Sequence, residues 1–187
     1  LAKILAKAEL TKEEFEAELI GTDALSDIAV IRIHKENQSA LPSAALGDSS
    51  RVRVGDRVLA MGSPLSISQS VTLGIVSNTE MVVPRMFEKY GIRLQMDGED
   101  VGSLVRWIAH DAAIYGGNSG GPLVNMQGEV IGINEINIGL GGAIPSSLAW
   151  QVARQIIDQG RVTRAWPPDS STRTRSLRPQ SHGRNPS

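Results

Sequence analysis

The feature that most constrains the fold is a succession of short apolar runs with the spacing of β-strands. In residues 15–20, apolar side chains alternate with acidic ones, which is the two-residue period of a strand with one wet face. Further β-branched or apolar runs, bounded by Gly, Pro or Asp, occupy residues 28–33, 71–76 and 130–133. Many short strands predict an all-β fold, arranged as a sandwich or a barrel.

A single helix is predicted near the C-terminal end. Leu148, Val152 and Ile156 recur at helical spacing. Ser146 is the expected N-cap and Gly160 the expected C-terminal stop.

Three other segments are less regular. Residues 1–10, LAKILAKAEL, fit a short amphipathic helix and a strand about equally well. Apolar residues on both sides of Gly55 and Asp56 predict a turn between two strands. Residues 78–106 mix Pro, Gly and acidic side chains, so we expect a long loop or extended hairpin between core strands.

Composition excludes several classes of protein. The net charge is -1, which gives no reason to expect nucleic acid as the main partner. There is no cysteine, so disulfides and a thiol nucleophile are excluded, and no apolar run reaches the ~18 residues of a membrane span. Residues 167–187 are rich in Ser, Pro and Arg and predict a disordered tail. Because the chain begins with Leu1, we expect its natural N-terminus to lie upstream.

The strongest chemical motif is Gly116-Gly117-Asn118-Ser119-Gly120-Gly121-Pro122. Acyl transfer needs a hydroxyl on a tight turn, with backbone N–H groups directed at the oxygen that becomes negative. Glycine two residues before the serine frees the backbone for that turn. The motif therefore predicts Ser119 as nucleophile, with N–H donors from Gly117 and Ser119 and a further candidate in Asn118. The alternatives are an ordinary glycine-rich turn and a nucleophile elbow, but an elbow is followed by a helix and a strand is expected here.

Asp27 is the candidate acid of a Ser/His/Asp arrangement. It stands at the start of the β-branched run 28–33, where a half-buried carboxylate can hold an imidazole in the required tautomer. Asp23 is the competing candidate, predicted to lie exposed in the middle of a loop.

Five segments together resemble the HtrA (Deg) family of serine proteases. These segments occur in the same order as in that family and cover most of residues 15–165. The segments are GTDALSDIAVIRI, LGDSSRVRVGDRVLAMGSP, SVTLGIVS, HDAAIYGGNSGGPLVNMQGEVIGIN and GGAIPSSLAWQVARQI. The resemblance implies a trypsin-like double β-barrel with one C-terminal helix and the site between the barrels. It also implies cleavage of unfolded or damaged proteins by a homotrimer or larger assembly that uses neither metal nor cofactor.

The resemblance also implies roles and boundaries in this chain. Ser119 matches the nucleophile, Asp27 the triad acid, and Gly117 and Asn118 the oxyanion loop. Ile114, Ile133 and Asn137 match the walls of an apolar specificity pocket suited to small aliphatic side chains. Residues 1–52 would complete the first barrel, residues 53–166 would form the second barrel with the helix, and residues 167–187 would form the tail.

The chain departs from this family first in its histidines. The family's catalytic histidine lies in a motif that would fall shortly upstream of Leu1, so we expect the first barrel to be incomplete here. His34 is predicted to lie about 20 Å from Asp27 along its strand, because a strand rises about 3.3 Å per residue. His110 is expected at the rim of the site, and His182 falls in the tail.

Two further departures concern the later part of the chain. Residues 160–166 resemble the family's entry into a PDZ domain, after which the sequence turns into the tail; we expect that domain to be lost from this chain. Residues 81–105 are longer and more polar than a minimal family loop, which fits a regulatory insertion and a tolerated one equally well.

Two functions follow from these patterns. The first is a serine endopeptidase that is periplasmic, secreted or membrane-anchored, as family members are. The second is a catalytically inactive pseudoprotease that binds peptides or acts as a chaperone, which would apply if the upstream residue is not histidine. The intact glycine-rich loop together with Asp27 favours the first.

Overall fold

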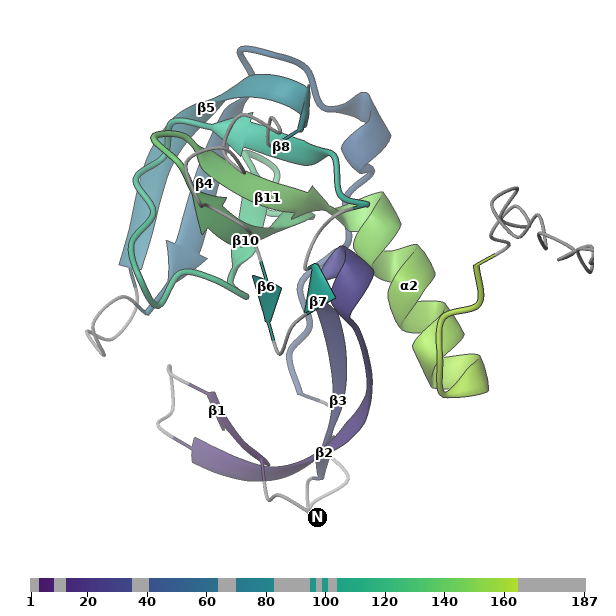
Figure 1. Ribbon diagram of the computed structural model, residues 1–187. Coiled ribbons are helices and arrows are strands. Elements are labelled where there is room, and N and C mark those ends of the chain that lie inside the picture. Colours follow the sequence, from purple (N-terminus) through teal and green to yellow (C-terminus); the bar gives the residue numbers. More distant parts are fainter. Residues whose placement is uncertain are drawn as a thin grey trace, which may run out of the picture.

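The computed structural model describes residues 4–8, 13–34, 41–63, 70–82, 95–96, 99–100 and 104–164. The predicted tail, His182 and most of the 81–105 segment lie outside the described residues. Six strands close into a barrel, a separate three-stranded sheet lies beside it, and one α-helix packs against both (Figure 1). This is the mainly β, trypsin-like architecture with one C-terminal helix that the strand patterns and the resemblance predict.

The three-stranded sheet is antiparallel, in the order β1-β2-β3. Its strands are β1 (Ile4–Ala8), β2 (Glu13–Asp23) and β3 (Ile28–His34), so the undecided N-terminal segment forms a strand at residues 4–8. Leu19 pairs with Ile31, and both side chains are exposed. Both pairings of this small sheet therefore involve β2, its central strand.

The barrel contains six of the strands that follow residue 56 and closes in the order β10-β11-β8-β5-β4-β9. All of its neighbouring strands are antiparallel. Its interior holds a cluster of small and branched apolar side chains that includes Val58, Val76, Ile108, Leu123 and Ala143. The strands are β4 (Arg57–Gly62), β5 (Ser70–Met81), β8 (Trp107–His110), β9 (Pro122–Asn125), β10 (Val130–Asn137) and β11 (Gly141–Pro145).

Four short elements lie outside these two sheets. The 3₁₀ turns η1 (Ala24–Ser26) and η2 (Ser49–Arg51) precede β3 and β4. The two-residue strands β6 (Gln95–Met96) and β7 (Glu99–Asp100) pair with each other.

Two strand boundaries differ from the prediction. The turn at Gly55 is present, with φ of 93°, but η2 precedes it where a strand was expected. Residues 78–81, predicted to belong to a long loop or an extended hairpin, continue β5, and Asn78 and Met81 pair with Ala109 and Trp107 of β8, which fits the hairpin alternative. That pairing joins residues about 30 positions apart, so local composition does not indicate it.

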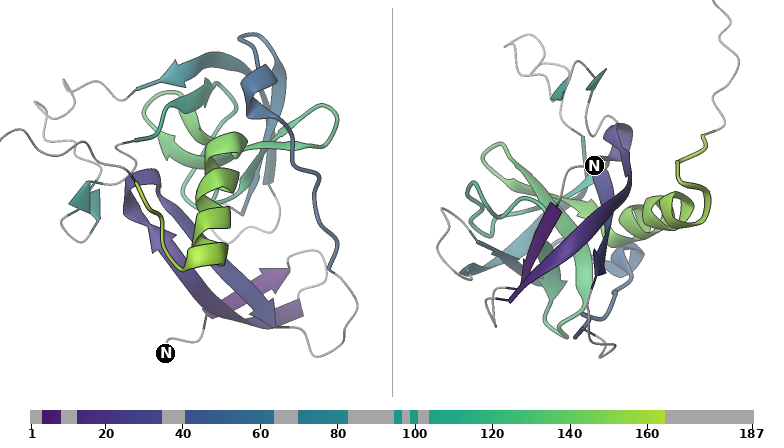
Figure 2. Two further views of the ribbon diagram at one scale, coloured as in Figure 1. Left: turned by 90° about the vertical axis from the view of Figure 1, so that its right-hand side faces the viewer. Right: turned by 90° about the horizontal axis from the view of Figure 1, so that it is seen from below.

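The helix α2 (Ser146–Gln159) packs against β10, β11, β2 and β3 and so joins the barrel to the small sheet (Figure 2). Its buried residues Val152 and Ile156 share a second apolar cluster with Ile28, Trp107 and Ile144. None of the described helices is long and apolar enough to cross a membrane. The helix therefore fixes the position of β3, and of Asp27 just before it, relative to the barrel.

The two predicted ends of α2 have different outcomes. Gly160 is the predicted stop: it has φ of 72°, and its N–H donates to the Ile156 carbonyl at 2.8 Å. The N-cap prediction for Ser146 is wrong, because Pro145 occupies the cap position and Ser146 is the first helical residue. The buried Ser146 hydroxyl donates to the Gly47 carbonyl at 2.7 Å. It therefore binds a distant part of the chain and does not cap the helix.

Candidate active site

Ser119 lies on a tight turn between β8 and β9, held by glycines in left-handed conformations. Gly117 and Gly120 have φ of 108° and 83°, which residues with a side chain rarely adopt. Within the turn, the Asn118 N–H donates to the Tyr115 carbonyl at 3.0 Å, and the Gly121 N–H donates to the Asn118 carbonyl at 2.9 Å. The glycine-rich motif thus forms the predicted turn.

The turn is anchored to β10 and to the end of β4. The Gly120 N–H donates to the Asn134 carbonyl at 2.8 Å, and the Asn134 N–H donates to the Gly121 carbonyl at 2.8 Å. The Ser63 N–H donates to the Gly117 carbonyl at 3.1 Å. These bonds hold Ser119 on a rigid part of the barrel.

The hydroxyl of Ser119 is exposed and oriented. Its Oγ donates to the Glu135 carbonyl at 2.9 Å. Among the acceptors that the structure describes, none binds the N–H of Gly117 or of Ser119, whereas the Asn118 N–H is engaged in the turn. Two backbone donors beside an exposed hydroxyl are the groups that acyl transfer requires.

Asp27 directly follows η1 and is the one described non-glycine residue with positive φ, at 52°. Its N–H donates to the Ala24 carbonyl at 3.1 Å, which closes the 3₁₀ turn. Aspartate tolerates this conformation better than most residues do. Asp27 stands just before β3, as the sequence predicts, but it is exposed rather than half-buried.

Glu135 of β10 brings these two segments together, and the sequence analysis missed it. Its carbonyl accepts the hydrogen bond from Ser119, and its carboxyl is affected by the charge of Asp27. Trp107 donates its indole N–H to Oε2 of the same carboxyl. Burial, with a further contribution from Asp27, raises the pKa of Glu135 to about 7. A lone acidic residue within the apolar strand VIGINEIN was the available signal.

Asp23, the competing acid, has a different role, and the prediction that it is exposed is wrong. Its side chain is only 9% exposed. Arg164 binds it with two parallel hydrogen bonds of 2.5 Å, and the Ser26 N–H donates to it at 3.1 Å. These contacts hold the pKa of Asp23 below its usual range, with the Arg164 hydrogen bonds contributing most. Asp23 therefore links the chain after α2 to the segment that carries Asp27.

Neither of the two described histidines is placed to act with Ser119 and Asp27: His34 lies at the far end of β3, and His110 is buried. His34 pairs with Glu16 at the far end of β3, and its Nε2 is 3.7 Å from Glu18 Oε2. His110 is fully buried, so its predicted position at the rim is wrong. It packs against the backbone of Gly141, where an added Cβ would lie 2.5 Å from its ring, and burial lowers its pKa. His110 is therefore neutral and structural.

The predicted pocket residues are only partly brought together. The buried Ile114 side chain belongs to the cluster inside the barrel, whereas Ile133 packs against the cluster under α2. Asn137 lies nearer to Ile114, since its Nδ2 donates to the Ile114 carbonyl at 2.7 Å. The hydrogen bond therefore joins β10 to the segment between β8 and the Ser119 turn.

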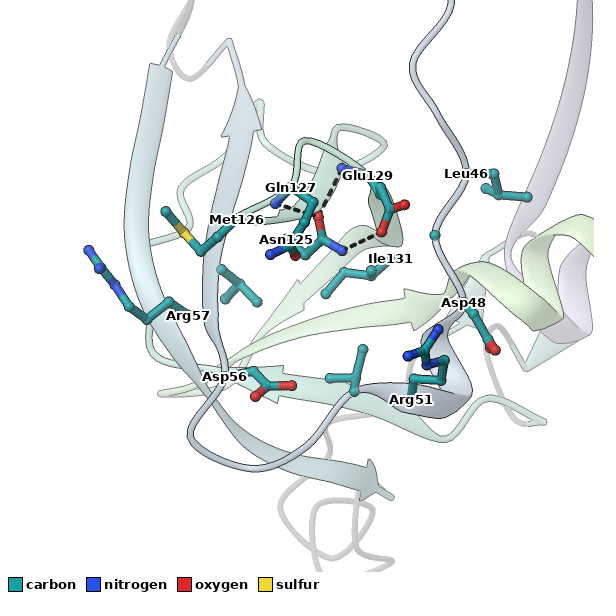
Figure 3. A pocket seen from close by; sticks show the side chains of 13 residues that line it. Leu46, Asp48, Arg51, Asp56, Arg57, Asn125, Met126, Gln127, Glu129 and Ile131 are labelled. Atoms are coloured by element: carbon teal, nitrogen blue, oxygen red, sulfur yellow. Dashed lines mark hydrogen bonds between the residues drawn. The ribbon is translucent and has the colours of Figure 1, made fainter.

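A surface hollow of about 700 Å³ lies elsewhere and contains neither Ser119, Asp27 nor Glu135 (Figure 3). It lies between the 46–58 segment and the β9–β10 turn. Asn125 closes that turn by accepting the N–H groups of Gln127 and Glu129, at 3.0 and 2.9 Å. Among the described residues there is no group of three His, Cys, Asp or Glu side chains that could hold a metal ion.

Comparison with known proteins agrees with this geometry. Residues 2–133 match the trypsin-like peptidase domain family. The chain is 40% identical over 158 residues to the periplasmic pH-dependent serine endoprotease DegQ of Escherichia coli (strain K12), a match that covers 81% of this chain and 31% of the relative. It is 41% identical over 162 residues to a probable periplasmic serine endoprotease DegP-like of Pseudomonas fulva (strain 12-X), covering 83% and 30%.

A solved structure gives the same relationship in three dimensions. The structure of the HtrA-type protease AlgW with decapeptide superposes with a TM-score of 0.70 at 35% identity, covering 88% of this chain and 47% of that chain. The chain spans about 30% of the length of the curated relatives it matches. The chain thus belongs to the trypsin-like peptidase family, and its relatives there are the HtrA-type serine endoproteases.

Proposed function

We propose that this chain carries the nucleophile and the orienting acid of a serine endopeptidase that cleaves unfolded or damaged protein chains. The single observation that supports the proposal most is the geometry of the Ser119 turn: an exposed hydroxyl stands on a glycine turn, and no described acceptor binds the N–H of Gly117 or of Ser119. Asp27 agrees with the proposal, because its charge contributes to the raised pKa of Glu135, the residue whose carbonyl binds the Ser119 hydroxyl.

In the proposed reaction, the Ser119 Oγ attacks the carbonyl carbon of the scissile peptide. A histidine from sequence upstream of Leu1 in the complete protein accepts the hydroxyl proton and passes it to the leaving amine, while Asp27 orients the imidazole. The N–H groups of Gly117 and Ser119 bind the oxyanion. The resulting acyl-enzyme is released by water activated by the same histidine.

The wider properties of the intact protein are part of this proposal. The relatives are named periplasmic endoproteases, which supports a periplasmic location. By the same family relationship, the protein assembles as a homotrimer or larger oligomer, and a PDZ domain follows α2 in the intact protein. The proposed specificity pocket, for small aliphatic side chains, takes its walls from Ile114, Ile133 and Asn137; the hydrogen bond from Asn137 to the Ile114 carbonyl supports the part formed by those two residues.

One observation favours a second candidate function. Neither of the described histidines lies beside Ser119 and Asp27, because His34 is at the other end of β3 and His110 is fully buried. A pseudoprotease that holds unfolded chains without cleaving them would need no histidine there.

The test uses the chain extended upstream and treated with a fluorophosphonate probe. We expect one labelled site, at Ser119, and no labelling above background in the Ser119→Ala variant, because the probe reacts only with an activated hydroxyl. Ser147→Ala is the matched control and should not change labelling, since Ser147 lies on α2 and its hydrogen bonds go to Ser49 and not to the turn. Labelling that survives Ser119→Ala contradicts the assigned nucleophile, and an unlabelled protein that still binds unfolded chains indicates the pseudoprotease.

A further inference from the structure

Asn134 of β10 is a buried polar residue whose side chain the proposed reaction does not use. It is 0% exposed and precedes Glu135, whose carbonyl binds the Ser119 hydroxyl. Its backbone carbonyl accepts from the Gly120 N–H, and its backbone N–H donates to the Gly121 carbonyl, both at 2.8 Å. The backbone of any residue could form those two bonds, so they leave the amide side chain unexplained.

The side chain of Asn134 binds two further backbone groups beside the Ser119 turn. Its Nδ2 donates to the Pro122 carbonyl at 3.1 Å and to the Met61 carbonyl at 3.4 Å. Pro122 begins β9, and Met61 lies near the end of β4. The amide nitrogen must face these two oxygens, because the amide oxygen in its place would be repelled by both. The Asn134 side chain therefore ties β10 to β4 and to the start of β9.

Three successive residues at the end of the turn are bound to this one residue. The Gly120 N–H, the Gly121 carbonyl and the Pro122 carbonyl all form hydrogen bonds with Asn134. Pro122 has no N–H, so it cannot donate to β10 at the point where β9 enters the barrel. The bond from the Asn134 amide to the Pro122 carbonyl supports the chain at that point.

These bonds also set the direction of a proposed oxyanion donor. The Gly121 N–H donates to the Asn118 carbonyl at 2.9 Å. The Asn118 carbonyl and the Ser119 N–H belong to one planar peptide group, so fixing the carbonyl also fixes the N–H. Since Asn134 holds Gly121, it determines through Gly121 where the Ser119 N–H points.

The Asn134 amide contributes less to folding than its two Nδ2 bonds would suggest. Its Oδ1 is buried and forms no hydrogen bond of standard geometry with a described residue. Burying such an atom costs free energy, which offsets part of the gain from Nδ2. The effect of the amide on the position of the turn is not reduced by this cost.

We propose that Asn134 is a positioning residue of the site: its side-chain amide holds residues 120–122 against β4 and β10 and thereby keeps the Ser119 hydroxyl and the Ser119 N–H in place for acyl transfer. The inference rests on the proposed role of Ser119 as nucleophile. Asn134 acts only through the backbone of the turn and takes no part in bond making or proton transfer.

Two substitutions separate the hydrogen bonds of the amide from its packing. Asn134→Ala removes the amide and leaves space, whereas Asn134→Leu removes the amide but keeps a side chain that branches at the same carbon. The matched control is Asn125→Ala, at the opposite end of β9. The Asn125 amide likewise fixes a turn, by accepting the N–H groups of Gln127 and Glu129, but that turn lies away from Ser119.

Amide hydrogen exchange of this chain, followed by nuclear magnetic resonance, tests these contacts without requiring activity. The Gly120 N–H reports on the Ser119 turn, and the Gly128 N–H, which donates to the Asn125 carbonyl at 3.1 Å, reports on the control turn. We expect both Asn134 variants to speed exchange about tenfold at Gly120 and less than about twofold at Gly128, because losing a buried hydrogen bond eases local opening. Asn125→Ala should show the reverse. Unchanged exchange at Gly120, or equal changes at both glycines, would overturn the inference.

Reactivity then tests whether the contacts matter for the site. In the chain extended upstream, a peptidyl phosphonate gives two constants, the labelling rate at saturation and the concentration for half of that rate. Both Asn134 variants should lower the saturating rate by at least about tenfold and change the half-saturating concentration by less than about twofold, because the turn carries the reacting groups. Asn125→Ala should leave both constants unchanged.

Asn134→Leu distinguishes positioning from a purely structural role. A general loss of stability lowers the amount of folded protein, whereas a displaced turn slows the reaction of each folded molecule. The rate is therefore measured per folded molecule, with the folded fraction taken from urea denaturation. A folded Asn134→Leu protein that reacts at the wild-type rate contradicts the positioning role.

The two failures are distinguishable. A wild type that is never labelled, although both Asn134 variants speed exchange at Gly120, refutes the proposed function and leaves the contacts of Asn134 with the turn standing. A wild type that is labelled at Ser119 at a rate unchanged by Asn134→Leu refutes the positioning role and leaves the proposed function standing.

Discussion

At the scale of single residues, close backbone approach explains why glycine is required around Ser119. A Cβ on Gly121 would lie 2.2 Å from the Met61 carbonyl oxygen and 3.0 Å from the Asn118 carbonyl oxygen, so β9 could not remain against β4. Gly116, at the start of the same motif, has no atom within 4 Å of the position where a Cβ would stand. Two glycines of one motif therefore have different structural roles.

This difference predicts the effects of two matched substitutions. Gly121→Ala should lower the free energy of unfolding by about 1–3 kcal/mol, because the backbone of β4 must move to admit the methyl group. Gly116→Ala should change it by less than about 0.5 kcal/mol. Urea denaturation followed by tryptophan fluorescence measures both. Equal effects of the two substitutions would show that the close contact with Met61 does not constrain the turn.

At the scale of elements, the segment from Asp23 to Asp27 connects the end of the chain after α2 to the proposed active site. Asp23 closes the start of η1 by accepting the Ser26 N–H, and Asp27 closes its end through the Ala24 carbonyl. Arg164 holds Asp23 from a position 141 residues away. A change at Arg164 therefore reaches Asp27 through one turn of 3₁₀ helix.

Removing Arg164 should destabilise the protein. In Arg164→Ala, the largely buried Asp23 carboxylate loses both of its charged hydrogen bonds, which should cost roughly 1–3 kcal/mol of unfolding free energy. Arg164→Lys should retain only part of this unfolding free energy, because an ammonium group cannot bind both carboxylate oxygens in parallel. Urea denaturation provides the measurement, with exposed Arg161→Ala as the control.

The pH dependence of that loss has a definite sign. Arg164 lowers the pKa of Asp23 below its ordinary 3.8, so the pair stabilises the fold fully above that value. The difference between wild type and Arg164→Ala should therefore persist at neutral pH and vanish as the pH falls through the lowered pKa. A difference that is unchanged in strong acid would mean that Arg164 stabilises through packing alone.

At the scale of the whole molecule, the sequence predicts what depends on local pattern. The strands at 28–33 and 130–133, the Ser119 turn and the Gly160 stop follow from periodicity and glycine chemistry, and the structure has all of them. The features that were missed depend on contacts between distant segments. The charge of Asp27 reaches Glu135 only when the small sheet packs beside the barrel, the His110 ring packs against Gly141, and the Ser146 hydroxyl binds the Gly47 carbonyl across 99 positions. No local rule places such partners together.

The central claim is that folding brings the Ser119 hydroxyl and the Asp27 carboxylate to one site with room for an imidazole between them. A crystal structure of the chain extended upstream, with a peptidyl phosphonate bound, tests it most directly. We expect phosphorus bonded to Ser119 Oγ, a phosphonate oxygen held by the N–H groups of Gly117 and Ser119, and a histidine between Asp27 and the adduct. An adduct on another residue, or Ser119 and Asp27 on separate faces of the molecule, would contradict it.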